Sequence, residues 1–456
     1  MKKPMTQEER FVQMIETPVS TLIPRLAVPT IISMLVTSIY NMADTFFVSQ
    51  IGTSASGAVG VMFSAMAMIQ AIGFTLGMGS GNYISRSLGD RNGGEADKSA
   101  ATAFFTALII GILITIVGLT FLRPLVFLLG ATETIAPYAM DYGIYILIAA
   151  PFMMSSFVMN NILRAQGNAM YSMIGITAGG ILNMILDPVL IFGFHMGIAG
   201  AAVATMVSQM ISFGILLYQC NFREGSIRLR LANFTPTWTM YGEILHAGLP
   251  SFCRQGLASV ATVILNFAAG PFGDSAIAAM SIVSRFMMFI NSALIGFGQS
   301  FQPVCGFNFG AKRYDRVLEA FWFCVKVAAV FLLVIGALGF AFAPQLIALL
   351  RDDPGVIAIG TVALRFQCVT FFFQAWITMS NMMLQTIGRT RPATVLAMGR
   401  QGLFFLPFIL VLPGFLGMLG VQMAQPLADL LTFVIAVPIQ LHVLRQMSRL
   451  PEAEHL

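Results

Sequence analysis

Two aspartic acids lie inside long apolar stretches of this chain, and each follows a polar residue by four positions. Asp44 follows Tyr40 within residues 24–48, and Asp187 follows Asn183 within residues 168–192. Residues four apart share one face of an α-helix. Two carboxylates in one low-dielectric pocket cannot both stay ionised unless a proton or a cation compensates them. The spacing therefore predicts a site that binds and releases H⁺ or Na⁺.

The helices expected around these acids place them at one depth. Each acid lies roughly 20 residues, or about 29 Å, into a helix that starts on the same side of the membrane. Thr205 reaches a similar depth on a helix that starts on the opposite side. The predicted Na⁺ ligands are Asp44, Asn183, Asp187 and Thr205, with Tyr40 beside them. The alternative is that both acids are structural groups bonded to helix ends near the outer surface.

The second half of the chain carries a different set of charges inside its apolar stretches. They are Arg254, Arg285, Arg365, Arg400 and Asp429. A buried guanidinium group must pair, reach water or contact a ligand. We expect Asp429 to pair with one arginine and the other arginines to line a wet cavity that favours anionic or zwitterionic cargo. Neutral candidates for the same cavity, each alone more typical of helix–helix contact, are Asn266, Asn291 and Gln374.

The composition of the chain is that of a membrane protein. Only 10% of its 456 residues are charged, 57% are hydrophobic, and the mean hydropathy is +0.82. Twelve apolar stretches are long enough, at about 20 residues or more, to cross a hydrocarbon layer. They cover residues 24–48, 55–84, 97–122, 137–160, 168–192, 197–220, 242–269, 275–303, 318–343, 355–383, 392–413 and 417–441. The sequence predicts an all-α membrane protein with twelve transmembrane helices and a short amphipathic helix over 6–17.

The distribution of Lys and Arg predicts the orientation of these helices. The segments on one side hold most of these residues, including Lys2, Lys3, Arg86 and Lys312, whereas the other side holds only Arg123 and Arg351. Cytoplasmic loops carry the excess of Lys and Arg. We therefore expect a multi-pass protein of the plasma membrane with both termini in the cytoplasm.

The second half of the chain repeats the first at a constant offset of 221 in residue number. The matched pairs include Pro29 with Pro250, Gly89 with Gly310, Gly167 with Gly388 and, after a one-residue slip, Gly197 with Gly417. Each unit holds six helices, so both units enter the membrane in the same sense and form two lobes related by a pseudo-twofold axis. The acids Asp44 and Asp187 have no acidic counterpart in the second unit, so a need of the shared scaffold does not explain them.

The repeat divides the chain into five regions. They are an N-terminal segment over 1–23, a first lobe over 24–220, a linker over 221–241, a second lobe over 242–445 and a tail over 446–456. Two parallel lobes with a seam between them are typical of transporters that work by alternating access. A channel would more often need a ring of identical polar groups or a filter segment.

Several other classes of function do not fit the sequence. The net charge of +5 reflects basic loops of a membrane protein, so no nucleic-acid partner is expected. The five cysteines form no CxxC pair and no zinc spacing. Motifs of metalloproteases, serine hydrolases and P-loop enzymes do not occur. We expect no enzyme, no cofactor besides the coupling ion and no nucleotide-binding domain in this chain, so transport must draw on an ion gradient.

Long segments of the chain resemble the MATE (multidrug and toxic compound extrusion) family of transporters. They include YNMADTFFVSQIG, ILNMILDPVLIFGFHMGIAGAAVATMVSQ and NFGAKRYDRV. The resemblance implies twelve helices in two lobes and export of amphipathic, often cationic drugs in exchange for H⁺ or Na⁺. It carries the cation site over to Tyr40, Asp44, Asn183, Asp187 and Thr205. Tyr142 and Asn160 also match family positions near that site.

The resemblance leaves the cargo open. Within the family, the chain is most similar to bacterial drug exporters whose cation-site acids lie in the N-terminal half. We therefore expect a bacterial inner-membrane protein, a monomer, whose partners are small amphipathic substrates and the lipid bilayer. The alternative is a flippase or exporter of anionic or lipid-linked cargo within the same superfamily, which the arginines of the second half favour. Arg254 lies where one branch of the family carries an acid, which argues against a second Na⁺ site there.

Overall fold

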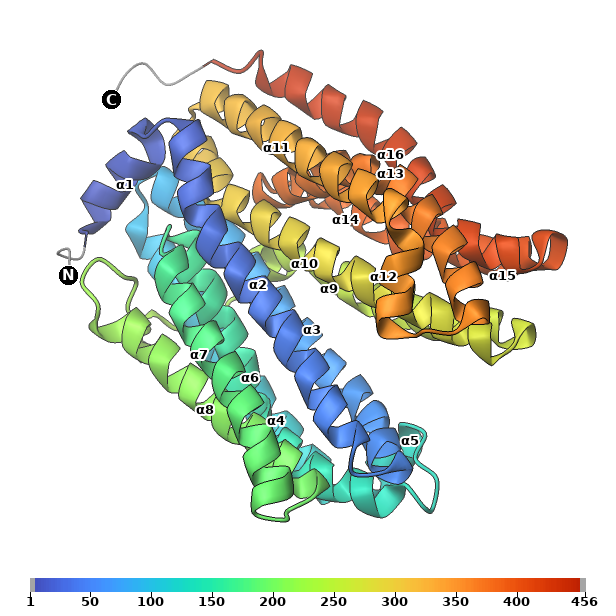
Figure 1. Ribbon diagram of the computed structural model, residues 1–456. Helices are drawn as coiled ribbons and strands as arrows, with labels where there is room; N and C mark the ends of the chain where they lie inside the picture. The colour runs from blue at the N-terminus through green and yellow to red at the C-terminus, as the bar shows by residue number, and fades with distance from the viewer. Residues whose placement is uncertain (1–4, 452–456) are drawn as a thin grey trace.

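The computed structural model describes residues 5–451, so Lys2, Lys3 and the last five residues of the expected tail lie outside the described residues. The regular structure of the described part is helical, and twelve of its helices are long and apolar enough to cross a membrane. The predicted fold class, an all-α membrane protein with two six-helix lobes, is confirmed (Figure 1).

Short helices supplement the membrane helices in both lobes. The first lobe consists of α2 (Val19–Ser49), α3 (Thr53–Gly89), α4 (Gly93–Thr120), α5 (Leu122–Leu128), α6 (Ala136–Ala165), α7 (Ala169–Pro188), the π-helix η1 (Val189–Gly193) and α8 (Ile198–Phe222). The second lobe consists of α9 (Trp238–Ala269), η3 (Gly270–Phe272), α10 (Asp274–Gly310), α11 (Tyr314–Ala341), α12 (Ala343–Leu350), α13 (Pro354–Thr386), α14 (Thr390–Met398), the π-helix η4 (Gly399–Leu403), α15 (Phe405–Leu416) and α16 (Met418–Met447). The helix α1 (Gln7–Glu16) precedes α2, and η2 (Leu231–Asn233) lies in the linker.

The internal repeat extends to the backbone. Helices α3 and α10 both have 37 residues, α4 and α11 both have 28, and the first residues of each pair differ by the offset of the repeat. Arg91 and Lys312, which follow α3 and α10, have φ angles of 53° and 57°. A positive φ is uncommon for residues other than glycine. Its occurrence at two positions that the repeat makes equivalent therefore indicates that the lobes share their backbone in detail.

Two membrane helices are interrupted by a wide turn. Pro188 ends α7, because proline lacks the N–H that would continue the helical hydrogen bonds, and the π-helix η1 follows it. The break after Pro188 thus has the form of a π-turn. The membrane span predicted over 392–413 is confirmed as Thr390–Leu416, within which the π-helix η4 separates α14 from α15. Gly399 and Gly402 lie in η4, and glycine is a weak helix former.

The amphipathic helix predicted over 6–17 is confirmed as α1. Thr6 and Glu9 form a capping box at its first turn, each side chain bonding to the other residue's backbone N–H. This arrangement satisfies N–H groups that have no partner inside a helix. Arg10 and Met14 are buried on the inner face of α1. The helix therefore packs on the molecule and does not extend from it.

The second lobe caps the last turn of α1. Asn308 of α10 donates to the Met14 carbonyl at 3.2 Å, and Arg316 of α11 donates to the Thr17 carbonyl at 2.6 Å. The last carbonyls of a helix lack partners within it, and a cation is favoured at that end by the helix dipole. Because α1 runs directly into α2 of the first lobe, these two bonds join the lobes.

The lobes converge at the end of the molecule where the described chain starts and finishes, and they diverge toward the opposite end (Figure 1). We call these the terminal end and the distal end. Asn82 of α3 accepts a hydrogen bond from Thr386 of α13 at 3.0 Å in the terminal half. Near mid-depth, the hydroxyl groups of Ser38 and Ser292 are 2.6 Å apart.

Glycines let the backbones of α3 and α10 touch in this seam. A Cβ at Gly89 would lie 2.2 Å from the Phe307 carbonyl oxygen, and one at Gly310 would lie 2.1 Å from the Arg86 carbonyl oxygen. Arg86 and Phe307 are equivalent positions of the repeat, as are the two glycines, so this contact obeys the pseudo-twofold symmetry. The seam at the terminal end thus has no room for a side chain at either position.

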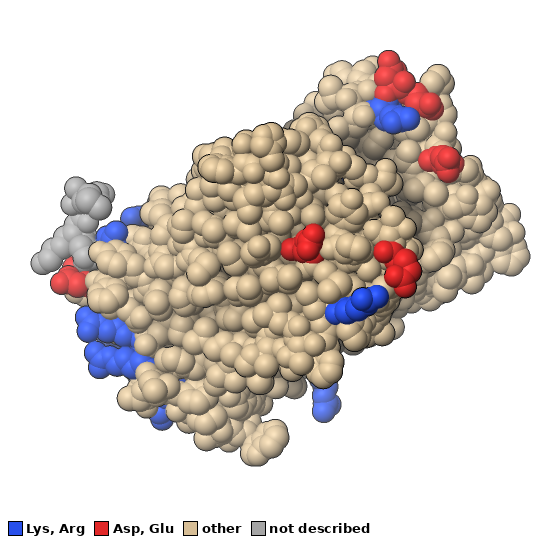
Figure 2. All heavy atoms as spheres, turned by 90° about the horizontal axis from the view of Figure 1, so that it is seen from below, with Lys and Arg blue, Asp and Glu red and all other residues tan. Residues whose placement is uncertain are grey.

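The outer surface is apolar at the membrane helices and charged at the ends. Leu113, Ile116 and Val117 of α4 are more than half exposed, as expected for side chains that face lipid. Figure 2 shows most of the visible Lys and Arg at one end of the face that it draws, whereas the other half carries most of the visible Asp and Glu together with a few isolated Lys or Arg side chains. This asymmetry is the one from which the sequence predicts the orientation.

Candidate functional site

The two acid-bearing helices of the first lobe, α2 and α7, pack directly against each other. Gly180 of α7 makes this approach possible, because a Cβ there would lie 2.9 Å from Val36 Cγ1 and 3.1 Å from Tyr40 Cδ1 of α2. Tyr40 therefore lies on the face of α2 toward α7. Asp44 follows one turn later on that face.

The helix α7 is joined to α8 on its other side. Asn183 donates to the Thr205 hydroxyl at 3.2 Å. One turn earlier on α7, a Cβ at Gly179 would approach Ser212 Cβ to 2.9 Å, so the helices touch closely. The structure thus brings together the predicted residues of three helices, with Asp187 one turn beyond Asn183.

Four oxygen atoms of this site are buried without a hydrogen-bond donor among the described residues. They are both carboxylate oxygens of Asp187, Oδ1 of Asp44 and Oδ1 of Asn183. Asp187 is fully buried. The Asp44 and Asp187 carboxyl groups lie within electrostatic range of each other, and Tyr142 lies within range of both. The site therefore concentrates oxygen acceptors, and neither acid forms an ion pair with a Lys or Arg of residues 5–451.

The buried oxygens without donors favour the binding of a proton or a cation at this site. An ionised carboxylate without donors is strongly disfavoured in a buried position. Carboxylate, amide and hydroxyl oxygens are ligands suited to hard cations. Pro188 also leaves the carbonyl of Met184, one turn earlier, without its usual helical donor, because proline has no N–H. The described residues contain no group of three or more His, Cys, Asp or Glu side chains that could hold a metal ion, so two carboxylates and neutral oxygens would bind it.

The two α6 residues that the family resemblance adds to the site, Tyr142 and Asn160, lie at different depths. Tyr142 is fully buried, and its hydroxyl contacts the Met66 sulfur at 3.8 Å. Asn160 bonds to Ser172 and accepts from Arg164 at 3.2 Å. Ser172 precedes Asp187 by 15 residues on α7, or about 22 Å along the axis. The prediction that placed Asn160 near the acids is therefore wrong, because it lies at the opposite end of the helix pair.

The carboxylate of Asp429, the acid predicted inside the second lobe, has hydrogen-bond donors for both oxygens and a guanidinium partner. Asp429 of α16 accepts from Arg400 Nε at 2.7 Å, from Gln425 at 2.9 Å and from Gln374 at 3.1 Å. The structure thus pairs Asp429 with one arginine, as the sequence analysis expects. Sequence analysis missed Gln425, although its position one turn before Asp429 places both on one face. Asn291 completes the group at 3.5 Å from Arg400 Nη1.

The other predicted cavity residues of the second lobe lie apart. Arg254 of α9 donates to Asn381 at 3.1 Å, and Arg365 donates to the Phe340 carbonyl at 3.1 Å and covers its ring. Asn266 is exposed on α9. The four arginines therefore do not line a single cavity, because their helices carry them at different depths and on different faces.

Arg285 of α10 lies on the side of the second lobe that faces the first. It is exposed, and it precedes Ser292 by seven residues, which is nearly two helical turns. Ser292 contacts Ser38 across the seam. Arg285 therefore projects toward the first lobe, distal to the point where the lobes touch.

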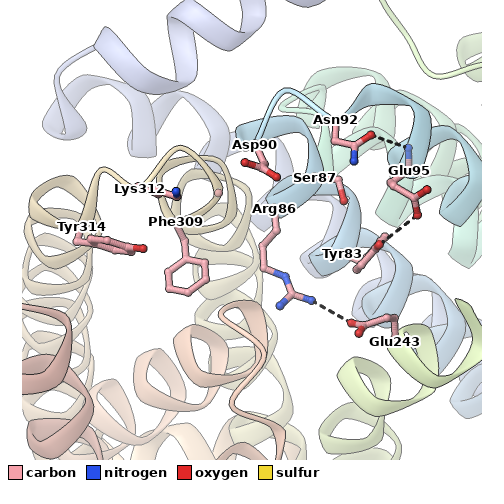
Figure 3. Close-up of a pocket in the computed structure, with 11 residues that line it drawn as sticks. Tyr83, Arg86, Ser87, Asp90, Asn92, Glu95, Glu243, Phe309, Lys312 and Tyr314 are labelled. Atoms are coloured by element: carbon pink, nitrogen blue, oxygen red, sulfur yellow. Dashed lines mark hydrogen bonds and ion pairs between the residues drawn. The ribbon is translucent and has the colours of Figure 1, made fainter. Parts of the chain in front are cut away.

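A charged cavity that sequence analysis missed lies between the lobes at the terminal end. It has a volume of about 390 Å³. Arg86 of the first lobe reaches Glu243 of α9 at 3.9 Å, and Tyr83 donates to Glu95 at 3.3 Å (Figure 3). Figure 3 also shows Tyr314 on the second-lobe side of this cavity. Sequence analysis assigns Arg86 only to membrane topology, because a loop charge in a sequence does not reveal a partner on another lobe.

Comparison with known sequences separates the chain into the same two units. The family model described as MatE matches residues 29–189 and residues 250–411. The starts of the two matched segments, at 29 and 250, reproduce the offset of the repeat. Each match spans the first five membrane helices of one lobe.

Similar proteins match over nearly their full lengths. The chain is 25% identical to the multidrug export protein MepA of Staphylococcus haemolyticus (strain JCSC1435), over 94% of this chain and 95% of that protein. It is 26% identical to MepA of Staphylococcus aureus (strain NCTC 8325 / PS 47), over 95% and 96%.

Solved structures also match the chain over nearly its full length. One is the outward-facing conformation of a multidrug resistance MATE family transporter of the MOP superfamily, with a TM-score of 0.90 and 27% identity over 96% of this chain and 99% of that one. Another is a MOP superfamily transporter from Pyrococcus furiosus Vc1, whose description reports a binding pocket of reverse polarity. It gives a TM-score of 0.89 and 26% identity over 96% and 99%.

Proposed function

Because the chain belongs to the MatE family of membrane transporters, we propose that it exports amphipathic organic compounds in exchange for H⁺ or Na⁺. The family resemblance expected from the sequence is confirmed, and the chain is a transporter and not an enzyme. Relatives named multidrug export proteins support the class of cargo. The unpartnered oxygens of Asp44, Asn183 and Asp187 carry the proposal of ion coupling.

In this proposal the first lobe couples ion binding to movement. Asp187 and Asp44 take up the ion from the distal side, with Asn183 and Thr205 as neutral ligands when the ion is Na⁺. Binding removes the repulsion between the two carboxylates and lets α2 and α7 pack more closely. The lobes then rock about their seam, so that a site between them opens to the terminal side and takes up cargo.

Transport into proteoliposomes tests this function. A pH gradient and a Na⁺ gradient are applied in separate experiments. We expect one of the two gradients to drive dye transport by the wild-type protein. Asp187→Asn should abolish the gradient-driven component, because it keeps the shape of the side chain and removes the ionisable group. Asp141→Asn is the matched control, because Asp141 is an exposed acid on α6. Gradient-driven transport by Asp187→Asn at the wild-type rate would contradict the proposal.

We place the protein in the bacterial inner membrane as a monomer with the terminal end in the cytoplasm. The basic surface at that end supports this orientation. A reporter that folds only in the cytoplasm, fused after residue 456, should be active. An active periplasmic reporter at the same position would reverse the assignment.

The alternative function is export of anionic or lipid-linked cargo. Two arginines of the second lobe favour it, because neither Arg254 nor Arg285 has a carboxylate partner among the described residues. The Pyrococcus furiosus transporter described as having a pocket of reverse polarity is a structural neighbour. Arg285→Gln should then slow the transport of an anionic dye several-fold and leave a cationic dye unaffected. Equal rates for both dyes in both proteins would exclude this alternative.

A further inference from the structure

The cavity of about 390 Å³ between the lobes at the terminal end has a counterpart on the other side of the pseudo-twofold axis. The repeat matches α3 with α10 without a gap, so the lining residues on these helices and the turns after them have equivalents at the offset of 221. The lining includes Ser87, Glu95 and Lys312, and the equivalents of these three residues are Asn308, Arg316 and Arg91. The contacts of the equivalents therefore show what the counterpart position holds.

The helix α1 fills the counterpart position. Asn308 and Arg316 donate to carbonyls at the end of α1. Arg91 pairs with Glu8 of α1 at 3.3 Å and lies over the Phe11 ring at 4.5 Å. All three equivalents thus contact α1, so a segment of the chain itself occupies that side of the seam.

The linker precedes α9 as α1 precedes α2, but it does not fill the cavity. None of the described residues that line the cavity belongs to the linker. Thr235 of the linker instead bonds to Thr102 of α4, with its N–H donating to the hydroxyl at 3.0 Å. The described chain therefore leaves this side of the seam hollow.

The charges of the cavity favour a cation. Its lining has three acids, Asp90, Glu95 and Glu243, against two basic residues, Arg86 and Lys312. At the counterpart position Arg316 replaces Glu95 and meets the negative end of the α1 dipole. A segment with a negative end thus fills one side of the seam, whereas the acids on the other side suit a positively charged ligand.

Aromatic rings lie beside the acids in this cavity and already contact a cation of the protein (Figure 3). The rings belong to Tyr83, Phe309 and Tyr314. The Arg86 guanidinium group lies 5.8 Å from the centre of the Tyr83 ring and 3.9 Å from Glu243. Organic cations bind to the faces of aromatic rings, and a carboxylate beside the ring adds its charge.

The contacts of Arg86 are long. Its distance to Glu243 exceeds that of a hydrogen bond. Its buried Nε has no hydrogen-bond partner among the described residues. Glu95 has a closer partner, because Lys98 lies 3.1 Å away. Glu243 is therefore the carboxylate beside Arg86 that a ligand cation reaches by displacing a single weak contact.

We propose that this cavity binds an organic cation on the terminal side of the molecule. The charged group of the ligand would take the place of the Arg86 guanidinium group between Glu243 and the Tyr83 ring. Its apolar part would lie against Phe309 and Tyr314. This proposal rests on the proposed export of amphipathic compounds, because the terminal side is the one from which cargo would be exported. It adds a binding site for cationic cargo that is separate from the proposed ion site.

Protection of a thiol in the cavity tests the proposal. In a cysteine-free background of the full chain, Ser87→Cys places a thiol among the lining residues. Tetraphenylphosphonium should slow its reaction with a soluble maleimide. Tetraphenylborate, an anion of the same shape, should do so only at concentrations at least about tenfold higher. Ser448→Cys is the control, because Ser448 is exposed at the same end and does not line the cavity, so neither ion should protect it.

The two partners of the ion pair should have opposite effects on this protection. Arg86→Gln removes the competing cation and should lower the tetraphenylphosphonium concentration for half-protection about tenfold. Glu243→Gln removes the carboxylate that binds the ligand and should raise that concentration about tenfold. Glu319→Gln is the matched control, because Glu319 is an exposed acid of α11 that does not line the cavity.

Three results would overturn the site. A shift in the same direction in Arg86→Gln and Glu243→Gln would mean that the ion pair only holds the lobes together. Equal protection by both ions would mean that the cavity takes apolar ligands regardless of charge. No protection by tetraphenylphosphonium in either the wild-type or the Arg86→Gln background would mean that no cation binds. The labelling uses detergent solution without an ion gradient, so it also distinguishes a failure of this site from a failure of coupled transport.

Discussion

Two buried acids of the same type, Asp187 and Asp429, have opposite surroundings. Asp429 accepts from three side chains, including a guanidinium group at 2.7 Å. Asp187 has no donor among the described residues for either oxygen. A buried carboxylate with a full set of donors is a structural group, whereas one without donors is free to exchange a proton or a cation.

This contrast predicts opposite effects of the same substitution on stability. Asp429→Asn leaves Arg400 without its charge partner and should lower the free energy of unfolding by about 3 kcal/mol. Asp187→Asn removes an uncompensated acid and should leave the unfolding midpoint unchanged or raise it. Thermal unfolding of the purified proteins in detergent, in buffer without Na⁺, measures both. A larger loss for Asp187→Asn than for Asp429→Asn would mean that Asp187 has structural partners.

Sequence spacing predicts such a site only when its residues share a helix or a depth. Asn183 and Asp187 are four apart, so their common face follows from helical geometry. The prediction that Asn160 lies near the acids rests on the family resemblance. Resemblance identifies the helix on which the residue lies but not the side chains to which it bonds. Gln425 and Glu243 were missed because an isolated polar residue has many packing roles. Only the arrangement of the helices shows which charges they meet.

Among the elements, α1 depends on the lobe to which it is not directly connected. Asn308 and Arg316 of the second lobe bond to the carbonyls of its last turn. Glu8 and Arg91 form an ion pair at 3.3 Å on the side of the first lobe. The helix thus spans the seam at the terminal end, and any movement that opens this end must break its contacts with the second lobe.

Removal of the second-lobe cap should therefore loosen α1. Arg316→Ala is expected to increase amide hydrogen exchange over residues 7–16 severalfold, because the last turn loses a charged cap of about 1 kcal/mol. Arg313→Ala is the control, since Arg313 pairs with Asp315 at 3.6 Å and does not bond to α1. Equal exchange in wild-type and Arg316→Ala proteins, measured by mass spectrometry, would show that the Arg316 bond does not hold α1 in place.

At the scale of the whole molecule, the order of helices and their two-lobe arrangement follow from hydropathy and the repeat. The breaks at η1 and η4 follow less readily, because a π-turn leaves no composition signal beyond a nearby proline or glycine. The tightness of the seam was also not predicted. Gly73, Gly77 and Gly81 form an evident stripe, but they pack α3 against α6 inside one lobe, whereas Gly89 contacts the other lobe.

The seam should open when a side chain is added to it. Gly89→Ala puts a methyl group about 2.2 Å from a backbone oxygen of α10, which cannot rotate away, so the lobes must separate at the terminal end. In a cysteine-free background, Thr386→Cys should then react faster with a soluble maleimide, by about tenfold for a shift of ~1.4 kcal/mol. Gly93→Ala, which has nothing within 4 Å, is the control. If Thr386→Cys reacts at an unchanged rate in the Gly89→Ala protein, the neighbouring residues accommodate the added methyl group and the lobes stay in contact.

The close contact of the lobes also has an electrical consequence. On α3, the glycines that touch the second lobe, Gly79 and Gly89, are ten residues apart, so the band of close contact is about 15 Å thick, half of a hydrocarbon core. Voltage falls mainly across layers that water does not enter, at ~2.3 kcal/mol per charge for each 100 mV. In this state the acids on α2 and α7 lie distal to that band of contact. An ion bound to them, as we propose, would exchange with the distal bath across only part of the membrane field, and the rest of the field would act when the contact moves to the other side.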